Sequence, residues 1–399
     1  MYPDFSYILH DLFGTRPDNW ASVFKTFGFF LATAVGVGAW LFRIELRRKA
    51  REGIFKPTTV VEVSGLPATP GELFGQALFG LLLGAKIPYA IRHFADFRQD
   101  PAAAIFSTKG NWAIGLLLAA LFALWRYWDG QRHKTDVPVR KKIKVYPHDK
   151  IAEIAMIAAF SGILGAKIFD LIEHLDAFFK DPVGVFFSGS GLAIYGGLIF
   201  GFIAVVWYLR KHFPGISILH AMDAVAPALI LAYGVGRIGC QLSGDGDWGI
   251  PVKGTTEAGV EYAYHKPAWL PDILWAQHYP HNIANEGVPI DGCTWTYCRQ
   301  LPVGVFPTPV YETTLAVLIF LILWALRKRL RIPGTLFFIF MFLDGLERFF
   351  IEKIRVNIRY HYFGLDFTQA QFIAVLMMAG GIIGTWWLWS RHRQKAKSY

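Results

Sequence analysis

Apolar runs of about 20 residues recur along almost the whole chain, and they restrict its fold more than any other feature. The chain has 399 residues, of which 54% are hydrophobic and 16% aromatic, and its mean hydropathy is +0.34. A helical run of that length matches the apolar thickness of a bilayer. A membrane β-barrel requires short alternating segments instead, and that pattern is not seen. We therefore expect an all-α polytopic membrane protein.

Nine segments are candidates for transmembrane helices. They lie near residues 24–42, 73–92, 112–128, 151–172, 191–209, 220–240, 311–326, 334–352 and 371–390. Five other segments hold 24 of the 40 Lys and Arg residues, and nine helices place all five on one side: 43–58, 126–150, 210–217, 327–331 and 391–399. Because Lys and Arg concentrate in cytoplasmic loops, we predict an outside N-terminus and a cytoplasmic C-terminus.

The formal charge of +10 is explained by these loops, so it does not indicate nucleic-acid binding. Asp4, His10 and Asp11 precede the first apolar run, which is not typical of a cleavable signal peptide. The expected organisation is an N-terminal periplasmic segment (1–23), six helices (24–240), a periplasmic loop or small head region (241–310), and three helices with a basic cytoplasmic tail (311–399).

The chain contains an internal repeat at an offset of 81 residues, between 72–128 and 153–209. Gly84-Ala-Lys-Ile87 matches Gly165-Ala-Lys-Ile168 without a gap, and matching residues flank it on both sides. The second and third helices therefore look like a copy of the fourth and fifth in the same orientation. Only the second copy has Tyr195-Gly-Gly197, so we expect the functional residues there.

Arg237 is the one charge in the apolar run 229–240, and a polar, glycine-rich segment follows it to Gly249. A charge at membrane depth costs roughly 2.5–3.5 kcal/mol on insertion scales, so it usually has an anionic partner. A guanidinium matches a phosphate, and here the phosphate of a lipid headgroup is available. Ser243 and Asp245 are candidates to bind a glycerol hydroxyl or to orient Arg237. The alternative is an arginine paired within the protein beside a surface turn.

Three further groups of residues are candidates for the same site. Asp344, Arg348, Glu352 and Arg355 recur at helical spacing, which also fits an interhelical ion-pair ladder. The glycines beside Tyr195 also fit plain helix packing. Tyr311 and Glu312 begin the seventh predicted helix, near the predicted level of Arg237.

Cysteines and histidines in the long loop do not predict a metal site. His278 and His281 with Cys293 and Cys298 match no zinc-ligand spacing. If the loop is extracytoplasmic, a disulfide between the two cysteines is permitted.

These blocks, in this order, resemble the prolipoprotein diacylglyceryl transferases. The family has a Gly-Arg-Ile signature, here Gly236 to Gly249, and a His-Gly-Gly element, here Tyr195-Gly-Gly. It also has a Pro-x-Gln/Thr-x-x-Tyr-Glu element, here Pro307 to Glu312, and an Arg-Phe-x-x-Glu-x-x-Arg helix, here Arg348 to Arg355. The resemblance implies a seven-helix membrane core, to which this chain adds the duplicated helix pair.

The resemblance also implies a reaction, in the bacterial inner membrane and without a cofactor or metal. The diacylglyceryl group of phosphatidylglycerol moves to the lipobox cysteine thiol of a preprolipoprotein, a thioether forms and glycerol 1-phosphate leaves. On this hypothesis Arg237, Arg348, Glu352 and Tyr195 are catalytic. The substrate-binding residues are Arg237, Ser243, Asp245, Gly249, Tyr311, Glu312 and Arg355.

Three positions depart from the family pattern. Tyr195 replaces the usual histidine, Cys240 an asparagine, and Phe27 a tyrosine of the first helix. Three other functions stay open: a lipid transporter or flippase, which the repeat favours; an inactive lipoprotein-binding relative, which Tyr195 favours; and a transferase that uses another lipid or acceptor.

Overall fold

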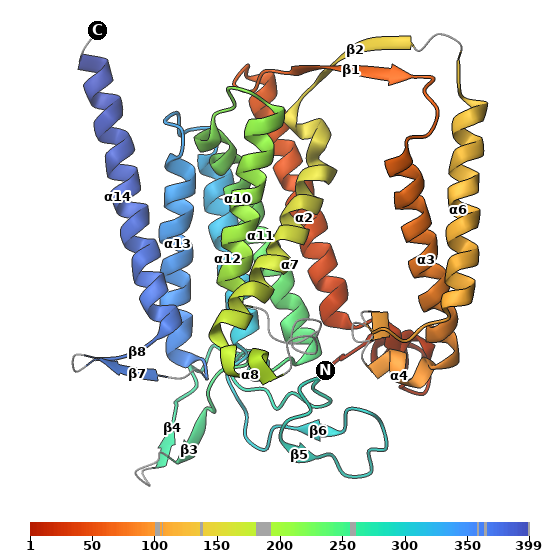
Figure 1. The fold of residues 1–399 in the computed structure, drawn as a ribbon. Helices are drawn as coiled ribbons and strands as arrows, with labels where there is room; N and C mark the ends of the chain where they lie inside the picture. Colours follow the sequence, from red (N-terminus) through yellow and green to blue (C-terminus); the bar gives the residue numbers. More distant parts are fainter. Residues whose placement is uncertain are drawn as a thin grey trace. The chain divides into compact units, whose positions relative to one another are not determined.

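The computed structural model describes residues 1–99, 104–105, 107–135, 139–180, 193–255, 261–356, 359–362 and 365–397. Its described part is mostly helical, as the apolar runs predict (Figure 1). The chain divides into two compact units. One combines Met1–Phe55 with Ser217–Tyr399, and the other is Lys56–Ile216.

The first unit is built on five long helices. They are α2 (Thr26–Arg51), α11 (Ile218–Ser243), α12 (Thr308–Leu326), α13 (Thr335–Ile351) and α14 (Gln369–Lys397). The core between α11, α12 and α13 is apolar and includes Ile230, Ile319, Leu323 and Phe340. This packing fixes the end of α11 that carries Arg237 against the first turn of α12.

Short elements lie between these helices. They are α1 (Phe5–Phe13), η1 (Trp20–Val23), η3 (Asp272–Leu274), η4 (Glu352–Ile354) and the strands β3 (Lys253–Thr255), β4 (Glu261–Ala263), β5 (Val288–Pro289), β6 (Arg299–Gln300), β7 (Arg359–Tyr362) and β8 (Leu365–Thr368). The strands pair as three hairpins, β3 with β4, β5 with β6 and β7 with β8. The sequence analysis predicts neither α1 nor these hairpins. Helix α1 does have a local start signal, because the Asp4 side chain is its N-cap and accepts a hydrogen bond from the Ser6 amide.

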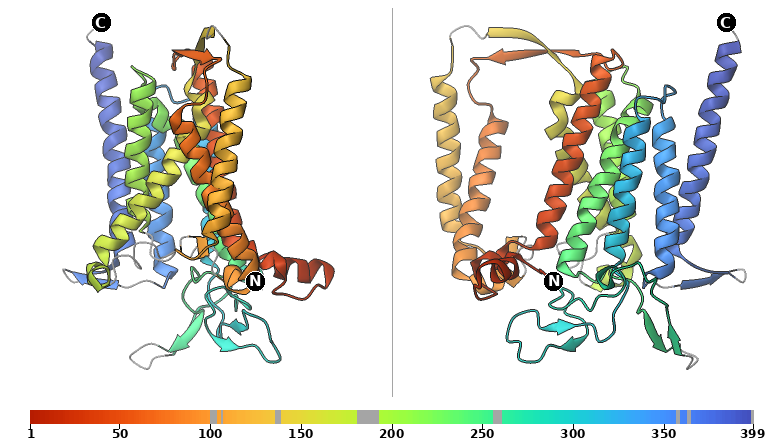
Figure 2. Two further views of the ribbon diagram at one scale, coloured as in Figure 1. Left: turned by 45° about the vertical axis from the view of Figure 1, so that its right-hand side comes forward. Right: turned by 180° about the vertical axis from the view of Figure 1, so that it is seen from behind.

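The second unit contains β1 (Thr58–Ser64), α3 (Pro70–Arg92), α4 (Phe94–Gln99), α6 (Trp112–Arg132), β2 (Val139–Val145), η2 (Pro147–Lys150), α7 (Ile151–Glu173), α8 (Leu175–Lys180) and α10 (Ile194–His212). Helix α3 packs against α6, and α7 packs against α10. Strands β1 and β2 form an antiparallel ribbon at one end of these helices (Figure 2).

The repeat in the sequence is a repeat in the structure. Helices α3 and α7, like the short α4 and α8 that follow them, have boundaries shifted by 81 residues at both ends. The helix pairs also cross at equivalent glycines. A Cβ on Gly84 would lie 2.8 Å from the Gly115 Cα, and one on Gly165 would lie 2.5 Å from the Gly196 carbonyl oxygen. Both copies therefore need glycine for the same close approach.

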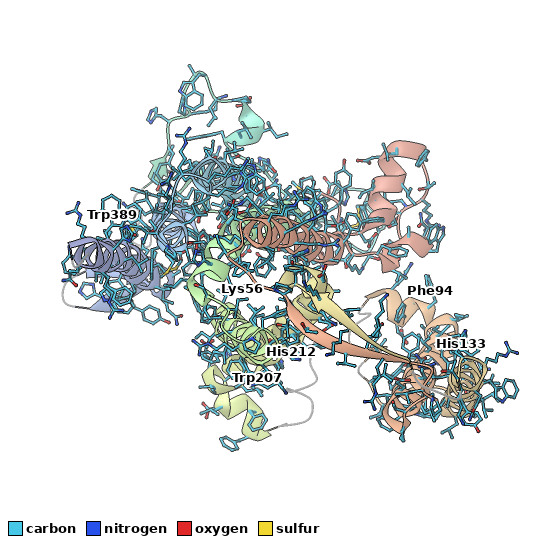
Figure 3. The ribbon with its side chains drawn as sticks, turned by 90° about the horizontal axis from the view of Figure 1, so that it is seen from above. Lys56, Phe94, His133, Trp207, His212 and Trp389 are labelled. Atoms are coloured by element: carbon cyan, nitrogen blue, oxygen red, sulfur yellow. A yellow bond between two sulfur atoms is a disulfide. The ribbon has the colours of Figure 1, made fainter. Side chains whose placement is uncertain are left out.

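Within the described residues, seven helical segments are long and apolar enough to cross a membrane, which supports a multi-pass membrane protein. They are α2, α3, α6, α7 with its preceding 3-10 turn, α11, α12 and α14. Helices α10 and α13 also overlap predicted spans but are not among the seven, so the count of nine and the orientation stay predictions. Figure 3 looks down the helices and labels exposed tryptophans on α10 (Trp207) and α14 (Trp389).

Candidate functional site

Arg237 lies in the next-to-last turn of α11 and is 8% exposed. Helix α11 ends at Ser243 because Gly244 takes a left-handed conformation, with φ of 63°, and turns the chain away. The segment that follows returns beside the arginine. The side chain is therefore enclosed, and its charge requires compensation inside the protein.

Glu312, near the start of α12, provides most of that compensation. Its side chain is fully buried, and its Oε2 accepts a hydrogen bond of 2.5 Å from Arg237 Nε. Arg237 Nη2 contacts the same carboxylate, and Arg237 Nη1 donates to Asp247. The structure thus pairs Arg237 within the protein, which is the alternative to direct lipid binding that its sequence context leaves open.

Two more arginines meet Glu312, Arg348 from α13 and Arg355 from the backbone that follows η4. Arg355 Nη1 lies 3.2 Å and Arg348 Nη1 3.4 Å from Glu312 Oε1. Arg355 also donates to Asp247 at 2.5 Å, and Arg348 Nη2 lies 3.4 Å from Glu352. We call these six residues the arginine cluster: Arg237, Asp247, Glu312, Arg348, Glu352 and Arg355. It contains three cations and three carboxylates.

Arg348 is the most loosely held member of the cluster. Its side chain is 28% exposed, against 10% for Arg237 and 11% for Arg355. Both its ionic contacts are 3.4 Å long. A guanidinium carries five N–H donors, so Arg348 retains the most capacity to bind an anion that enters the cluster.

The expected helical stripe from Asp344 to Arg355 is interrupted. Helix α13 ends at Ile351, and Glu352 opens the 3-10 turn η4. Arg348 and Glu352 still interact, but Arg355 reaches the cluster from extended backbone. That backbone pairs with Gly249, where a Cβ would lie 2.6 Å from the Ile354 carbonyl oxygen. Gly249 therefore allows the close approach that brings Arg355 into place.

Asp247 is the cluster residue that sequence reasoning missed. Burial raises the pKa of its carboxyl group, but Arg237 and Arg355 outweigh this effect and hold the pKa below its ordinary value. Asp245 behaves in the opposite way, because burial and the nearby Asp247 raise its pKa. The sequence feature that could have indicated Asp247 is the presence of two acidic residues beside a single arginine in the segment 237–249.

The other predicted site residues have structural contacts. Ser243 is fully buried and its hydroxyl lies 3.5 Å from the Cys240 carbonyl oxygen. The Tyr311 hydroxyl donates to the Leu274 carbonyl, which ties the long loop to α12. Tyr195 is half-buried in the first turn of α10, in the second unit. Its neighbour Gly196 makes the close crossing with α7, as the packing alternative predicts.

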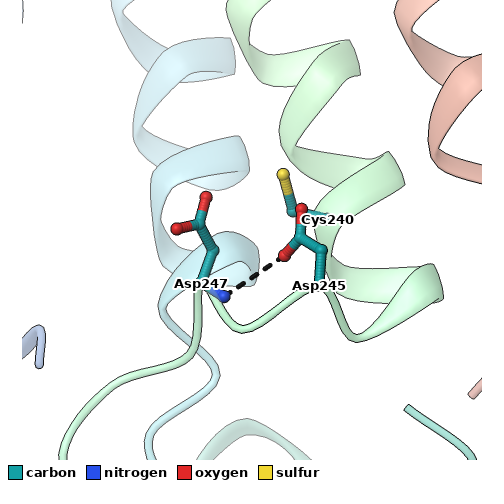
Figure 4. Close-up of side chains that lie close together, drawn as sticks. All are labelled: Cys240, Asp245 and Asp247. Atoms are coloured by element: carbon teal, nitrogen blue, oxygen red, sulfur yellow. Dashed lines mark hydrogen bonds between the residues drawn. The ribbon is translucent and has the colours of Figure 1, made fainter. Parts of the chain in front are cut away.

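Among the residues that the structure describes, one group has the spacing of metal ligands, namely Cys240, Asp245 and Asp247 (Figure 4). Their ligand atoms lie within 4.8 Å of one another. However, Asp247 already bonds two arginines, and Arg237 Nη1 lies 3.4 Å from the Cys240 sulfur. Two guanidinium cations at these ligands would repel a metal cation. The geometry therefore suits arginine binding better than metal binding.

Within the long loop, a disulfide joins Cys293 to Cys298, a bond that the sequence permits but does not require. His278 and His281 each place Nδ1 on a backbone carbonyl, of Leu301 and Tyr297. These contacts explain both histidines by the folding of the loop.

The fold and the cluster together define a multi-pass membrane protein with three arginines gathered around one buried glutamate, a site suited to an anion. Comparison with known proteins identifies the family. The family model described as prolipoprotein diacylglyceryl transferase matches residues 112–387, well over half of the chain. This protein belongs to the prolipoprotein diacylglyceryl transferase family, and it is a transferase.

Individual relatives agree with this assignment. A phosphatidylglycerol–prolipoprotein diacylglyceryl transferase of Clostridium tetani is 28% identical over 244 residues, which cover 61% of this chain and 82% of the relative. The protein of the same name from Dehalococcoides mccartyi (strain BAV1) is 29% identical over 290 residues, or 71% and 92%. That of Pseudomonas putida is 25% identical over 299 residues, or 73% and 95%.

Proposed function

We propose that this protein transfers the diacylglyceryl group of phosphatidylglycerol to the lipobox cysteine thiol of preprolipoproteins. The enzyme would act in the bacterial inner membrane, with nine helices, an outside N-terminus and a cytoplasmic C-terminus. The observation that carries the proposal is the arginine cluster at one end of apolar helices, in a chain that belongs to this family. The names of the relatives supply the two substrates.

The reaction is a displacement at the glycerol carbon that bears the headgroup phosphate. The cysteine sulfur attacks as the thiolate and forms a C–S bond. The C–O bond to the phosphate breaks, and glycerol 1-phosphate leaves with the electron pair. Negative charge grows on the leaving phosphate, so donors held ready at that position lower the barrier.

Arg348 is proposed to give up its contacts with Glu312 and Glu352 and to bind the lipid phosphate instead. Its exposure and its long contacts support this role. Arg237 and Arg355 supply positive charge and hold Glu312 and Asp247 in fixed positions. Glu352, which is buried beside Arg348, is the proposed acceptor of the thiol proton or the group that orients this arginine. Tyr195 is proposed to donate a hydrogen bond to the phosphate.

A cavity of about 580 Å³ is a candidate position for the acceptor peptide. It is lined by the end of α11 (Gln241), the start of α12 (Val310) and by Tyr7, Gln277 and Trp295. Gln241 and Val310 belong to the two helices that carry Arg237 and Glu312, so the cavity is built on the same two helices as the cluster. It would receive the residues that follow the lipobox cysteine.

The test is incubation of the purified protein with phosphatidylglycerol and a lipobox peptide, followed by mass analysis of the peptide. We expect the mass of the diacylglyceryl thioether with the wild-type protein. We also expect it with Arg327→Ala, because Arg327 lies just after α12 and pairs with Glu45, outside the arginine cluster. We expect no such product with Arg237→Ala. Movement of lipid without a covalent product, or near-normal activity of folded Arg237→Ala protein, would contradict the proposal.

A further inference from the structure

Strands β1 and β2 form a ribbon that lacks a third strand within the described residues. Seven residues of each strand pair, from Thr58 opposite Val145 to Ser64 opposite Val139. An isolated two-stranded ribbon is marginally stable in water and needs another surface against one of its faces. A ribbon of seven residue pairs is therefore expected to lie against another surface.

The strand register sorts the charged side chains of the ribbon onto one face. Residues directly opposite each other share a face, and faces alternate along a strand. One face carries the pairs Thr59–Lys144, Val61–Lys142 and Val63–Arg140, and the other carries Thr58–Val145, Val60–Ile143 and Glu62–Lys141. The first, here called the cationic face, has three cations and no acid. The second, here called the apolar face, carries Val60, Ile143 and Val145 together with Thr58 and one pair of opposite charge.

The three cations are available to a partner. Arg140, Lys142 and Lys144 are exposed, and in the described part of the chain none of them forms an ion pair. Val60, on the other face, is also 44% exposed. The cationic face is thus accessible at all three cations, whereas the apolar face is exposed at Val60 and buried at Val145.

The ribbon lies where helices of its unit begin and end. β1 leads into α3, α6 ends shortly before β2, and β2 leads through η2 into α7 (Figure 1). The same helix ends carry exposed tryptophans, Trp128 on α6 and Trp207 on α10, and Lys211 packs 4.8 Å over the Trp207 ring. Such tryptophans are typical of the level of the lipid headgroups. The Tyr208–Glu153 hydrogen bond fixes this end of α10 beside the start of α7.

We propose that the ribbon lies in the headgroup layer of the bilayer and binds anionic phospholipid headgroups through Arg140, Lys142 and Lys144. Its apolar face enters the boundary of the acyl region, as the apolar face of an interfacial helix does. Each cation near an anionic leaflet contributes to the attraction. Topology alone explains why basic residues lie in this loop, but not why the register segregates three of them from the one acid. This inference does not depend on the proposed reaction.

The test is hydrogen exchange of the full-length protein in two kinds of lipid nanodisc, one of phosphatidylcholine and one that also contains phosphatidylglycerol. Both bilayer surfaces are accessible in a nanodisc, so a change of membrane topology during biosynthesis does not confuse the result. We expect the backbone amides of residues 58–64 and 139–145 to exchange more slowly with phosphatidylglycerol present. The protection should fall with added salt.

A triple variant and a matched control separate the cationic face from general charge. In Arg140→Gln/Lys142→Gln/Lys144→Gln the extra protection should fall by about fivefold for each cation removed. In Lys141→Gln/Lys328→Gln/Arg329→Gln, which loses the same charge outside the cationic face, it should persist. Equal exchange in both lipids, or equal loss in both variants, would overturn the proposal.

Discussion

Two arginine–glutamate clusters lie at opposite ends of α12. They differ in how many of their arginine N–H donors are already bonded within the protein. Glu312 lies near the start of this helix and Arg327 follows its last residue, roughly 22 Å away along the helix axis. At the second end Arg327 and Arg48 surround Glu45, which is as fully buried as Glu312. Both sites therefore contain a buried carboxylate with more than one arginine.

The second cluster is closed by the protein itself. Arg48 donates to Glu45 at 2.7 and 3.0 Å and to Glu52 at 2.7 Å. Arg327 lies 2.9 Å from Glu45 and stacks 3.2 Å over the Trp324 ring. The first cluster has one more arginine, and its Arg348 is partly exposed with two long contacts. Burial of an arginine is thus a poor sign of function by itself, and remaining donor capacity is a better one.

Arg237→Ala should give the largest effect of all. It leaves Glu312 and Asp247 without their closest cation, so the free energy of unfolding should fall by roughly 3–5 kcal/mol. Product formation should fall by about 10²–10³-fold, as when one stabilising donor is removed from an active site. Denaturant unfolding and mass detection of the thioether measure the two effects. If folded Arg237→Ala protein kept its activity, the first cluster, like the second, would serve only the stability of the fold.

Arg348→Ala should separate activity from stability. Because Arg348 is the exposed member with long contacts, its loss should change the unfolding free energy by no more than about 1 kcal/mol. Product formation should still fall by about 10²-fold. Arg348→Lys, which keeps the charge but not the planar fork, should recover part of the rate. A loss of stability as large as that of Arg237→Ala would show that Arg348 mainly stabilises the fold.

Glu45→Gln should show the reverse pattern. It removes the negative charge beside Arg48 and Arg327 and should lower the unfolding free energy by about 2 kcal/mol. The rate per folded molecule should not change. A specific loss of rate would mean that the second cluster also serves the reaction.

Acid titration of Asp247→Asn and Asp245→Asn should give the smallest effects, of opposite sign. The pKa of Asp247 is lowered from 3.8, so its stabilisation is present above about pH 4 and is lost as pH falls through the lowered pKa. The pKa of Asp245 is raised from 3.8, so its carboxylate destabilises the fold at neutral pH. Asp247→Asn should thus lower, and Asp245→Asn raise, the stability at pH 7. Both differences should vanish in strong acid, which unfolding midpoints between pH 3 and 7 would reveal.

Local patterns in the sequence predict much of this fold. The nine predicted segments overlap helices, because apolar length is a local property. The repeat predicts the equal boundaries of α3 and α7 and the equivalent crossings at Gly84 and Gly165. Each of these features depends either on residues close together in the chain or on the similarity of the two repeated segments.

Long-range pairing is what the sequence leaves undetermined. Arg237 and Glu312 are 75 residues apart, and no local pattern indicates that they meet. Arg355 reaches the cluster only because η4 ends the helix and Gly249 admits its backbone. The partners of β1 and β2 are separated by the whole α3–α6 pair, so their pairing is likewise not visible locally.

Titration of glycerol 1-phosphate into the detergent-solubilised protein tests the role of the arginine cluster most directly. This soluble product carries the phosphate that the cluster is proposed to hold, and glycerol is the matched ligand without it. Wild-type protein and Arg327→Ala should bind glycerol 1-phosphate equally and more tightly than glycerol, while Arg348→Ala should lose about tenfold or more in affinity. Equal affinity in all three proteins would contradict the account.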